Sequence, residues 1–229
     1  MTRKESAARA IAARLHAAGY TAYLAGGCVR DRLLGHAPKD FDVASNAPTA
    51  VVQRVFPKTI PVGVQFGVVI VIQDEEAVEV ATFRADDVYL DGRHPTGVRF
   101  SSPEEDARRR DITINGMFLD PVSDTVIDYV GGQEDLARGI IRAIGDPAAR
   151  ISEDRLRMLR AVRFAARFGF AIEPATFAAM HAAAPSIIDI AWERIGDEVV
   201  RILTDSTAGS ARRGFELLDE SGLLAPVLP

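Results

Sequence analysis

The sequence predicts an α+β fold in two parts, a small mixed or antiparallel sheet with helices followed by an all-helical part. Three observations predict it. Short β-branched runs alternate with helical segments in the first 146 residues, every periodic segment from Ile151 onward is helical, and Gly145-Asp146-Pro147 ends the last predicted strand. We therefore expect two domains, at residues 1–146 and 147–229.

Composition places the chain among ordinary globular proteins. Its 229 residues are 48% hydrophobic and 26% charged, which is enough for a sizeable core. The net charge of −5 argues against indiscriminate binding to polyanions. The arginines are nevertheless concentrated, because six of them between Arg150 and Arg167 face only Glu153 and Asp154. This local positive charge is compatible with RNA binding.

The cysteine content and the N-terminal residues favour a reducing compartment. Cys28 is the only cysteine, which excludes a disulfide framework and a cysteine zinc site. The first twenty residues have too short an apolar stretch for a signal peptide or a membrane span, and they predict an amphipathic helix. Their early arginines would also suit a transit peptide, which Glu5 disfavours. We expect a cytoplasmic protein that does not bind membranes.

The stretch Leu24–Ser45 organises the rest of the chain. It contains an apolar strand, a glycine pair, a short basic helix and a second strand. Gly26 and Gly27 carry no side chain, so a turn at this point can bring its backbone close to an anion. Arg30 supplies a planar, permanently charged group of donors that suits phosphate.

Asp40 and Asp42 open the second strand of this stretch. Residues two apart on a strand project to the same face, as two carboxylates must when they hold a hard divalent cation. Glycine pairs and acidic strand ends are each common at protein surfaces, but the two in this order are less ordinary. Together they predict a surface for a nucleoside triphosphate with Mg²⁺.

The next segments predict strands and a possible third acid. Residues Val62–Ile72 and Ala77–Phe83 are rich in β-branched residues, and Gln73–Glu76 between them predicts a hairpin. Glu79 on the second of these strands is either a third carboxylate beside the acid pair or a solvated outward side chain. The sequence favours neither reading.

A polar segment and a basic helix follow. Residues Arg84–Phe100 lack periodicity and predict a mobile loop, in which His94 is better explained as a solvated residue than as a general base. Residues Ser101–Glu105 predict a helix start with acids in its first turn. The helix leads to three consecutive arginines that end at Arg110, and such runs usually form only a solvated face.

The helical part opens with a strongly patterned segment. Ser152 is a natural N-cap, followed by two acids in the first predicted turn. At about 100° per residue, four arginines fall on one side of the helix and three apolar residues on the other. These are Arg157, Arg160, Arg163 and Arg167, opposite Leu159, Val162 and Ala166.

Asp154 lies one turn before Arg157, so a helix could present the two side by side. A carboxylate accepts and a guanidinium donates, and the pair therefore matches a base edge with an amino donor beside a ring acceptor. Cytosine and adenine offer that edge, whereas uracil and guanine place a carbonyl where the amino group should be. A surface ion pair without any ligand is the alternative explanation.

These motifs resemble a known family. GGCVRDRLLG, PKDFDVAS, RRDITINGM and EDRLR are similar to motifs of the class II tRNA nucleotidyltransferases (CCA-adding enzymes) and of the bacterial poly(A) polymerases. The third motif departs from the usual RRDFTINAM at Ile112 and Gly116, and neither change removes a polar group. The resemblance covers essentially the whole chain and implies a polymerase-β-like head followed by an all-α neck.

The resemblance also implies site residues and a reaction. Asp40 and Asp42 would be catalytic and would hold Mg²⁺. ATP and CTP would be the donors and the tRNA 3′ end the acceptor, with pyrophosphate released. The nucleotide-binding residues that it implies are Gly27, Arg30, Arg110, Asp154, Arg157, Arg160 and Arg163.

Two alternatives remain at this stage. One is a poly(A) polymerase or a partial CC- or A-adding enzyme, although the length of the segment Arg84–Phe100 favours an enzyme able to add A. The other is a non-catalytic RNA-binding relative, which has no need to keep two close carboxylates near a polyanion. Family members continue into helical body and tail domains beyond the neck, so the sequence leaves tRNA binding and product length open.

Overall fold

The computed structural model describes residues 1–86, 98–204 and 209–228, and these form two compact units. The head unit holds the described residues up to Gly132 except Asp111–Thr113. The helical unit holds Asp111–Thr113 and the described residues from Gln133 onward. Residues 133–146 thus belong to the helical unit, and the functional division at residues 1–146 and 147–229 stays a prediction.

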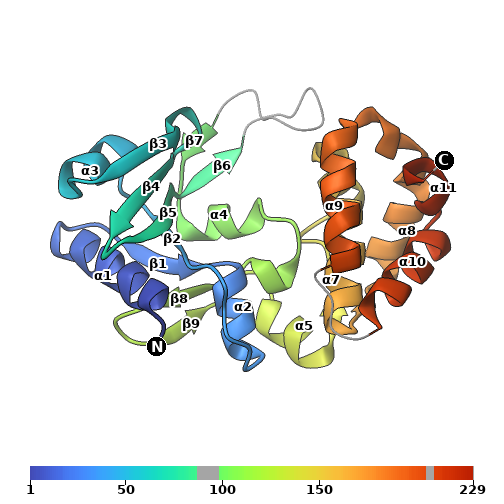
Figure 1. The fold of residues 1–229 in the computed structure, drawn as a ribbon, viewed down its shortest axis with the longest axis horizontal. Coiled ribbons are helices and arrows are strands. Elements are labelled where there is room, and N and C mark those ends of the chain that lie inside the picture. Colours follow the sequence, from blue (N-terminus) through green and yellow to red (C-terminus); the bar gives the residue numbers. More distant parts are fainter. Residues whose placement is uncertain (87–97, 205–208, 229) are drawn as a thin grey trace. The chain divides into compact units, whose positions relative to one another are not determined.

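A seven-stranded mixed sheet forms the centre of the head unit (Figure 1). Its order is β3-β4-β5-β2-β1-β8-β9, with β2 and β5 parallel and the other neighbours antiparallel. This confirms the predicted small mixed sheet. The strands are β1 (Ala22–Ala25), β2 (Asp42–Ser45), β3 (Thr59–Gly63), β4 (Val68–Gln73), β5 (Glu76–Thr82), β8 (Phe118–Asp120) and β9 (Thr125–Ile127).

In the described part of the head unit, four α-helices accompany this sheet: α1 (Arg3–Ala17), α2 (Gly27–Leu33), α3 (Thr49–Val55) and α4 (Pro103–Arg108). Helix α1 buries an apolar stripe that includes Ala7, Ala8 and Ile11, and it packs against β1, β2 and β5 with α3 beside it (Figure 1). Helix α4 begins where the sequence predicts a helix start, and the structure adds a capping box between Ser102 and Glu105.

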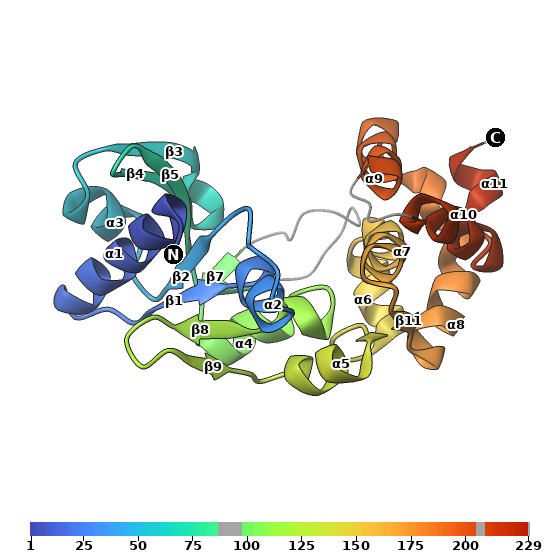
Figure 2. The ribbon, with the colours of Figure 1, turned by 60° about the horizontal axis from the view of Figure 1, so that its bottom comes forward.

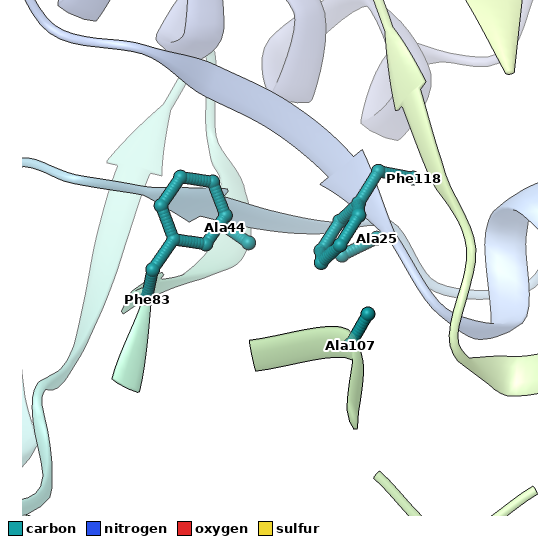
Figure 3. Close-up of a cluster of buried hydrophobic side chains, with 5 residues drawn as sticks. All are labelled: Ala25, Ala44, Phe83, Ala107 and Phe118. Atoms are coloured by element: carbon teal, nitrogen blue, oxygen red, sulfur yellow. The ribbon is translucent and has the colours of Figure 1, made fainter. Parts of the chain in front are cut away.

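A small aromatic core fixes the strands that carry the predicted site (Figure 3). Alanines on β1 and β2 leave room for two phenylalanine rings, whose centroids lie 5.8 Å apart in an edge-to-face arrangement. Helix α4 closes the cluster with a further alanine. Its members are Ala25, Ala44, Phe83, Ala107 and Phe118.

The β4–β5 hairpin has a two-residue turn. Asp74 and Glu75 both have positive φ, at 52° and 67°, which is the backbone of the tight turn that matches strand twist. The hairpin prediction is confirmed. The single strand predicted over Val62–Ile72 is wrong, because the 3₁₀ turn Val64–Phe66 and Gly67, at φ 80°, divide it between β3 and β4.

The segment predicted as a loop has ordered ends. Its first and last residues form the antiparallel strands β6 (Arg84–Asp86) and β7 (Val98–Phe100). Residues 87–97, which include His94, lie outside the described residues.

The helical unit contains seven helices within its described residues. Figure 2 shows α7 nearly end-on, with α6, α9 and α10 beside it. The helices are α5 (Gly132–Arg138), α6 (Pro147–Glu153), α7 (Leu156–Phe168), α8 (Pro174–Ala183), α9 (Trp192–Thr204), α10 (Ser210–Glu220) and α11 (Leu224–Val227). The short parallel strands β10 (Ile140–Ile141) and β11 (Ala171–Ile172) are the exception to its helical character. No helix in the described parts of the chain is long and apolar enough to cross a membrane.

One helix start differs from the prediction. Ser152 does not cap a helix but lies inside α6, where its hydroxyl donates to the carbonyl of Ala149. Asp146 is the N-cap, and Pro147 occupies the first turn. The backbone then extends at Asp154 (φ −149°, ψ 105°) before α7 begins. The predicted single helix is therefore two helices with a break at a predicted site residue.

Candidate nucleotide and metal site

The glycine turn in the head unit follows β1 directly. Gly26 adopts φ 69° and ψ −123°, a backbone conformation that L side chains rarely reach, and its N–H donates to the carbonyl of Met117. A Cβ on Gly26 would lie 3.1 Å from Nη1 of Arg110. The glycine is therefore needed both for the turn and for the close approach of an arginine to it. Gly27 begins α2.

Arg110 is held against this turn from several directions. Its Nε and Nη2 donate to Asp106 at 3.2 and 3.0 Å, and its Nη1 donates to the carbonyl of Asn115. Its guanidinium lies 5.0 Å from the ring of Phe118, over the core cluster. Burial alone would raise the pKa of Asp106, but the charges of Arg110 and Arg109 lower it. Asp106 therefore stays ionised and fixes Arg110.

Arg30 differs from the prediction in its placement. Its side chain is buried, with the residue 4% exposed, and its Nε and Nη2 donate to Asp31 at 2.9 and 2.7 Å. Its Nη1 donates to Oδ1 of Asn115 at 2.6 Å. A buried guanidinium needs such partners because its charge cannot be left desolvated. In this structure Arg30 therefore orients the side chain of Asn115, and the backbone carbonyl of Asn115 accepts a hydrogen bond from Arg110.

The two predicted acids lie on either side of a buried aromatic residue. Phe41 packs into the core, so Asp40 and Asp42 both emerge toward solvent. The parallel register of β2 and β5, which pairs Val43 with Val80, places Asp42 opposite Glu79 on the next strand. Sequence reasoning left the placement of Glu79 open, and the structure puts it next to the acid pair.

The carboxylates of this group repel one another. Partial burial raises the pKa of Asp42 to about 6, and the charges of Glu79 and Asp40 add to the rise. Arg110 and Lys4 act in the opposite direction without cancelling it. Hard oxygen donors with an excess of negative charge fit a divalent cation. Among the described residues, however, no three His, Cys, Asp or Glu side chains gather closely enough to form a metal site on their own.

In the helical unit, by contrast, a buried carboxylate is paired with an arginine. Arg160 of α7 donates from Nε to Oδ2 of Asp111 at 2.7 Å, and the Asp111 side chain is only 9% exposed. Burial would raise the pKa of Asp111, but Arg160 overrides this and lowers it to about 2. The same ion pair raises the pKa of Arg160. Asp111 belongs to the motif that supplies Arg110, so adjacent residues serve different units.

Asp154 and Arg157 each have a partner of their own. Asp154 accepts from Nη2 of Arg194 at 2.8 Å through one oxygen and from the backbone N–H of Leu156 through the other. Arg157 donates from Nη1 to Glu153 at 2.6 Å. The predicted one-turn pairing on a continuous helix does not occur, because Asp154 precedes α7 with an extended backbone. Both side chains are instead oriented by neighbours.

Arg163 is buried with a carboxylate. Its Nε donates to Glu198 of α9 at 2.7 Å, with the two side chains 7% and 4% exposed, and its guanidinium lies over the ring of Phe164. Three of the four arginines on the predicted arginine side of α7, Arg157, Arg160 and Arg163, therefore form ion pairs. The opposite side is buried as predicted, at Leu159, Val162 and Ala166.

The partners were missed by sequence reasoning although most lie inside the motifs that it used. Each is an acid, amide or arginine one or a few positions from a predicted site residue, or in the segment WERIGDE of α9. Complementary charge was the available signal, but spacing along the chain could not show which residues meet. These partners are Asp31, Asn115, Asp111, Glu153, Arg194 and Glu198.

Two family models match the chain. Residues 22–142 match the "Poly A polymerase head domain", which is more than half of the sequence. Residues 169–229 match the "Probable RNA and SrmB- binding site of polymerase A". The first match contains the glycine turn, the acid pair and Arg110.

Relatives with assigned names cover most of the chain. A CCA-adding enzyme of Limosilactobacillus fermentum is 44% identical over 197 residues, which is 86% of this chain and 49% of the relative. Poly(A) polymerase I of Salmonella typhi is 42% identical over 227 residues, which is 94% of this chain and 48% of the relative. The chain thus spans about half the length of these relatives.

Solved structures have the same fold. The Bacillus stearothermophilus CCA-adding enzyme in complex with CTP superposes with a TM-score of 0.88 at 41% identity, over 97% of this chain and 53% of that one. A tRNA nucleotidyltransferase complexed with a primer tRNA and an incoming ATP analog gives 0.79 at 27% identity, over 95% and 62%.

Proposed function

Because the chain belongs to the nucleotidyltransferase family that has the poly(A) polymerase head domain, we propose that it catalyses template-independent addition of C and A to the 3′ end of tRNA. CTP and ATP are the donors, and pyrophosphate is released. The names of the relatives and the nucleotide and tRNA complexes of the structural neighbours support this assignment.

One observation carries the proposal. The chain combines an acid pair beside a glycine turn with an acid and an arginine that are each held by a separate partner. The first arrangement suits triphosphate chemistry, and the second suits recognition of a base. We assign the first to a catalytic domain at residues 1–146 and the second to a neck domain at residues 147–229.

Nucleotidyltransferases of this family are metal-dependent, and we assign Mg²⁺ to Asp40 and Asp42. Their hard oxygen atoms and their mutual repulsion fit such a cation. When bound, the metal would lower the pKa of the attacking 3′-hydroxyl and offset charge on the leaving pyrophosphate. Glu79 keeps the local potential negative and so favours cation binding.

The glycine turn and Arg110 serve the triphosphate. At Gly26 and Gly27 no Cβ obstructs a phosphate, and Arg110 lies within contact of this turn. The chain Arg30–Asn115–Arg110 keeps that guanidinium in one orientation, so little conformational entropy is lost when an anion binds. We assign Arg30 to this positioning role.

We assign recognition of the base to Asp154 and Arg157. The carboxylate accepts the amino group of cytosine or adenine, and the guanidinium donates to the neighbouring ring nitrogen. Uracil and guanine would place a carbonyl against a carboxylate that cannot donate, leaving both groups unsatisfied. Arg160 and Arg163 supply positive charge for the nucleotide while Asp111 and Glu198 hold them in place.

The test is incubation of the protein with Mg²⁺, a tRNA that ends before its CCA sequence, and each nucleoside triphosphate separately and together. We expect CTP to be incorporated first, ATP to follow only after CTP, and neither UTP nor GTP to be used. Sequencing of the extended tRNA reads the product. Failure to incorporate any nucleotide would exclude the catalytic proposal and favour a non-catalytic RNA-binding protein.

Poly(A) synthesis is the second candidate, because the matched Salmonella protein is a poly(A) polymerase at nearly the same identity. The same incubation separates the two activities. A poly(A) polymerase would extend RNA with ATP alone and would produce long tails, whereas a CCA-adding enzyme stops after three nucleotides. Addition of C only, or of A only to a tRNA that ends in CC, would identify a partial enzyme.

A further inference from the structure

Lys4 contacts the acid pair, and no role proposed so far uses it. Its ammonium lies 2.5 Å from Oδ1 of Asp40, 36 residues away along the chain. The lysine is in the first turn of α1, whereas Asp40 lies two residues before β2. The contact is therefore made by the fold and not by neighbouring positions in the sequence.

The position of Lys4 is set by buried residues. Ala7 and Ala8, one turn further along α1, are fully buried against the sheet. Because side chains three and four positions apart share a helix face, Lys4 leaves α1 on the side that packs against the sheet. Its side chain is 29% exposed, whereas that of Asp40 is 75% exposed. The lysine side chain is thus the more buried member of the pair.

We propose that Lys4 is a built-in competitor for the metal at Asp40, and that its ammonium sets how tightly the acid pair holds a divalent cation. A cation that binds through Oδ1 must displace the ammonium from that oxygen. The inference rests on the proposed metal site and adds a residue that tunes it.

Charge and geometry both support this role. Negative charge exceeds positive charge around Asp42. The carboxylates are Asp40, Asp42 and Glu79, and the cations are Lys4 and Arg110. Arg110 is already bonded to Asp106 and Asn115, so it cannot approach Asp40 without breaking those bonds. Lys4 is bonded to Asp40 alone among the described residues, and its flexible stem lets the ammonium move away.

The chain offers a matched control. Lys39 is adjacent to Asp40 in the sequence and is exposed, but it forms no ion pair among the described residues. Lys4→Met and Lys39→Met remove the same charge from the same neighbourhood, and only the first removes the contact. Lys4→Arg keeps a cation that can reach the carboxylate.

The experiment measures binding of Mn²⁺ alone by isothermal titration calorimetry, without nucleotide. Exposed ion pairs have modest strength, so we expect Lys4→Met to lower the Kd for Mn²⁺ about two- to fivefold. Lys39→Met should change it less than about 1.5-fold, and Lys4→Arg should bind like the wild type. The half-saturating Mg²⁺ concentration for CTP incorporation should fall in Lys4→Met by the same factor.

Four outcomes would contradict the role of Lys4 or the metal site on which it rests. An unchanged Kd in Lys4→Met, or equal changes in the two Met variants, would overturn the role of Lys4. If the wild type does not bind Mn²⁺, or binds it equally well after Asp42→Asn, the proposed metal site itself fails. Circular dichroism melting confirms that each variant is folded, and Lys4→Gln provides a second neutral substitution should Lys4→Met lose structure.

Discussion

The two candidate sites handle charge in opposite ways. In the head unit, Asp40, Asp42 and Glu79 carry more negative charge than Lys4 and Arg110 offset, and the pKa of Asp42 rises to about 6. In the helical unit, each of the arginines assigned to the nucleotide has a carboxylate partner, and the pKa of Asp111 falls to about 2.

This difference indicates what each site is built to do. An excess of like charge costs stability and is tolerated where a ligand of opposite charge completes the site. Paired charges contribute orientation instead, because each guanidinium or carboxylate is fixed before a ligand arrives. We therefore expect substitutions in the head unit to affect turnover, and substitutions in the helical unit to affect stability or base choice.

The largest effect is expected for Asp42→Asn. Loss of a proposed metal ligand should lower the rate of CTP incorporation at least about 10⁴-fold, which corresponds to about 5.5 kcal/mol. The free energy of unfolding should not fall, because the substitution relieves repulsion with Glu79. Single-turnover kinetics and urea unfolding measure the two quantities.

Glu79→Gln is the matched control for this prediction. It removes a carboxylate from the same face of the sheet but not from the proposed ligands, so the rate should fall far less. A variant of Asp42 that keeps substantial activity, or one that loses as much stability as activity, would contradict the contrast between the two units.

The sequence predicted the acid pair, the glycine turn and the start of α4 because each depends on residues close together in the chain. It also predicted the β4–β5 hairpin from a polar interruption between two β-branched runs. These features need only local rules, such as alternation along a strand or acids in the first turn of a helix.

What the sequence missed depends on contacts between distant residues. Burial of Arg30 follows from Asn115, 85 positions later, and the orientation of Asp154 follows from Arg194, 40 positions later. The break at Asp154 escaped prediction because Ser152 followed by two acids fits an N-cap as well as Asp146-Pro147 does. A strand of two residues, such as β11, has too few positions to show a pattern.

The next largest effect is expected in the buried pair of the helical unit. Arg163→Met leaves Glu198 buried without its main partner and should lower the free energy of unfolding by about 3 kcal/mol. Arg201→Met, which removes a mostly exposed contact to the same carboxylate, should cost less than about 1 kcal/mol. Fluorescence of Trp192, the only tryptophan in the sequence, reports unfolding of the helical unit.

The double variant Arg163→Met with Glu198→Met sharpens this prediction. Removing both charges avoids an unpaired buried carboxylate, so the double variant should be more stable than Arg163→Met alone. Equal stability of the two would show that the arginine contributes by its volume and not by its charge.

A pH dependence of stability should follow from Asp111. Its pKa is lower in the folded protein than the usual 3.8, so the folded state favours the ionised carboxylate. The resulting stabilisation, about 2 kcal/mol, is fully present above about pH 4 and disappears as the pH falls through about 2. Asp111→Asn should lack this contribution. The difference between the wild-type and variant unfolding free energies, measured from pH 6 to pH 2, should shrink toward low pH, and a constant difference would contradict the ion-pair explanation.

The smallest expected effect concerns base choice, which is where the arrangement in the helical unit should matter for function. Asp154→Ala removes the acceptor for the amino group, so discrimination between CTP and UTP should fall roughly 10- to 100-fold, or about 1–3 kcal/mol. The rate with CTP should fall less than about tenfold, because Asp154 is not assigned to the chemistry.

Arg194→Met keeps the carboxylate but removes the group that holds it, and should reduce discrimination by only about three- to tenfold. Competition between labelled CTP and UTP for one tRNA measures both variants. Continued exclusion of UTP by Asp154→Ala would mean that this carboxylate does not read the base, whereas equal losses in the two variants would mean that its orientation matters as much as its presence.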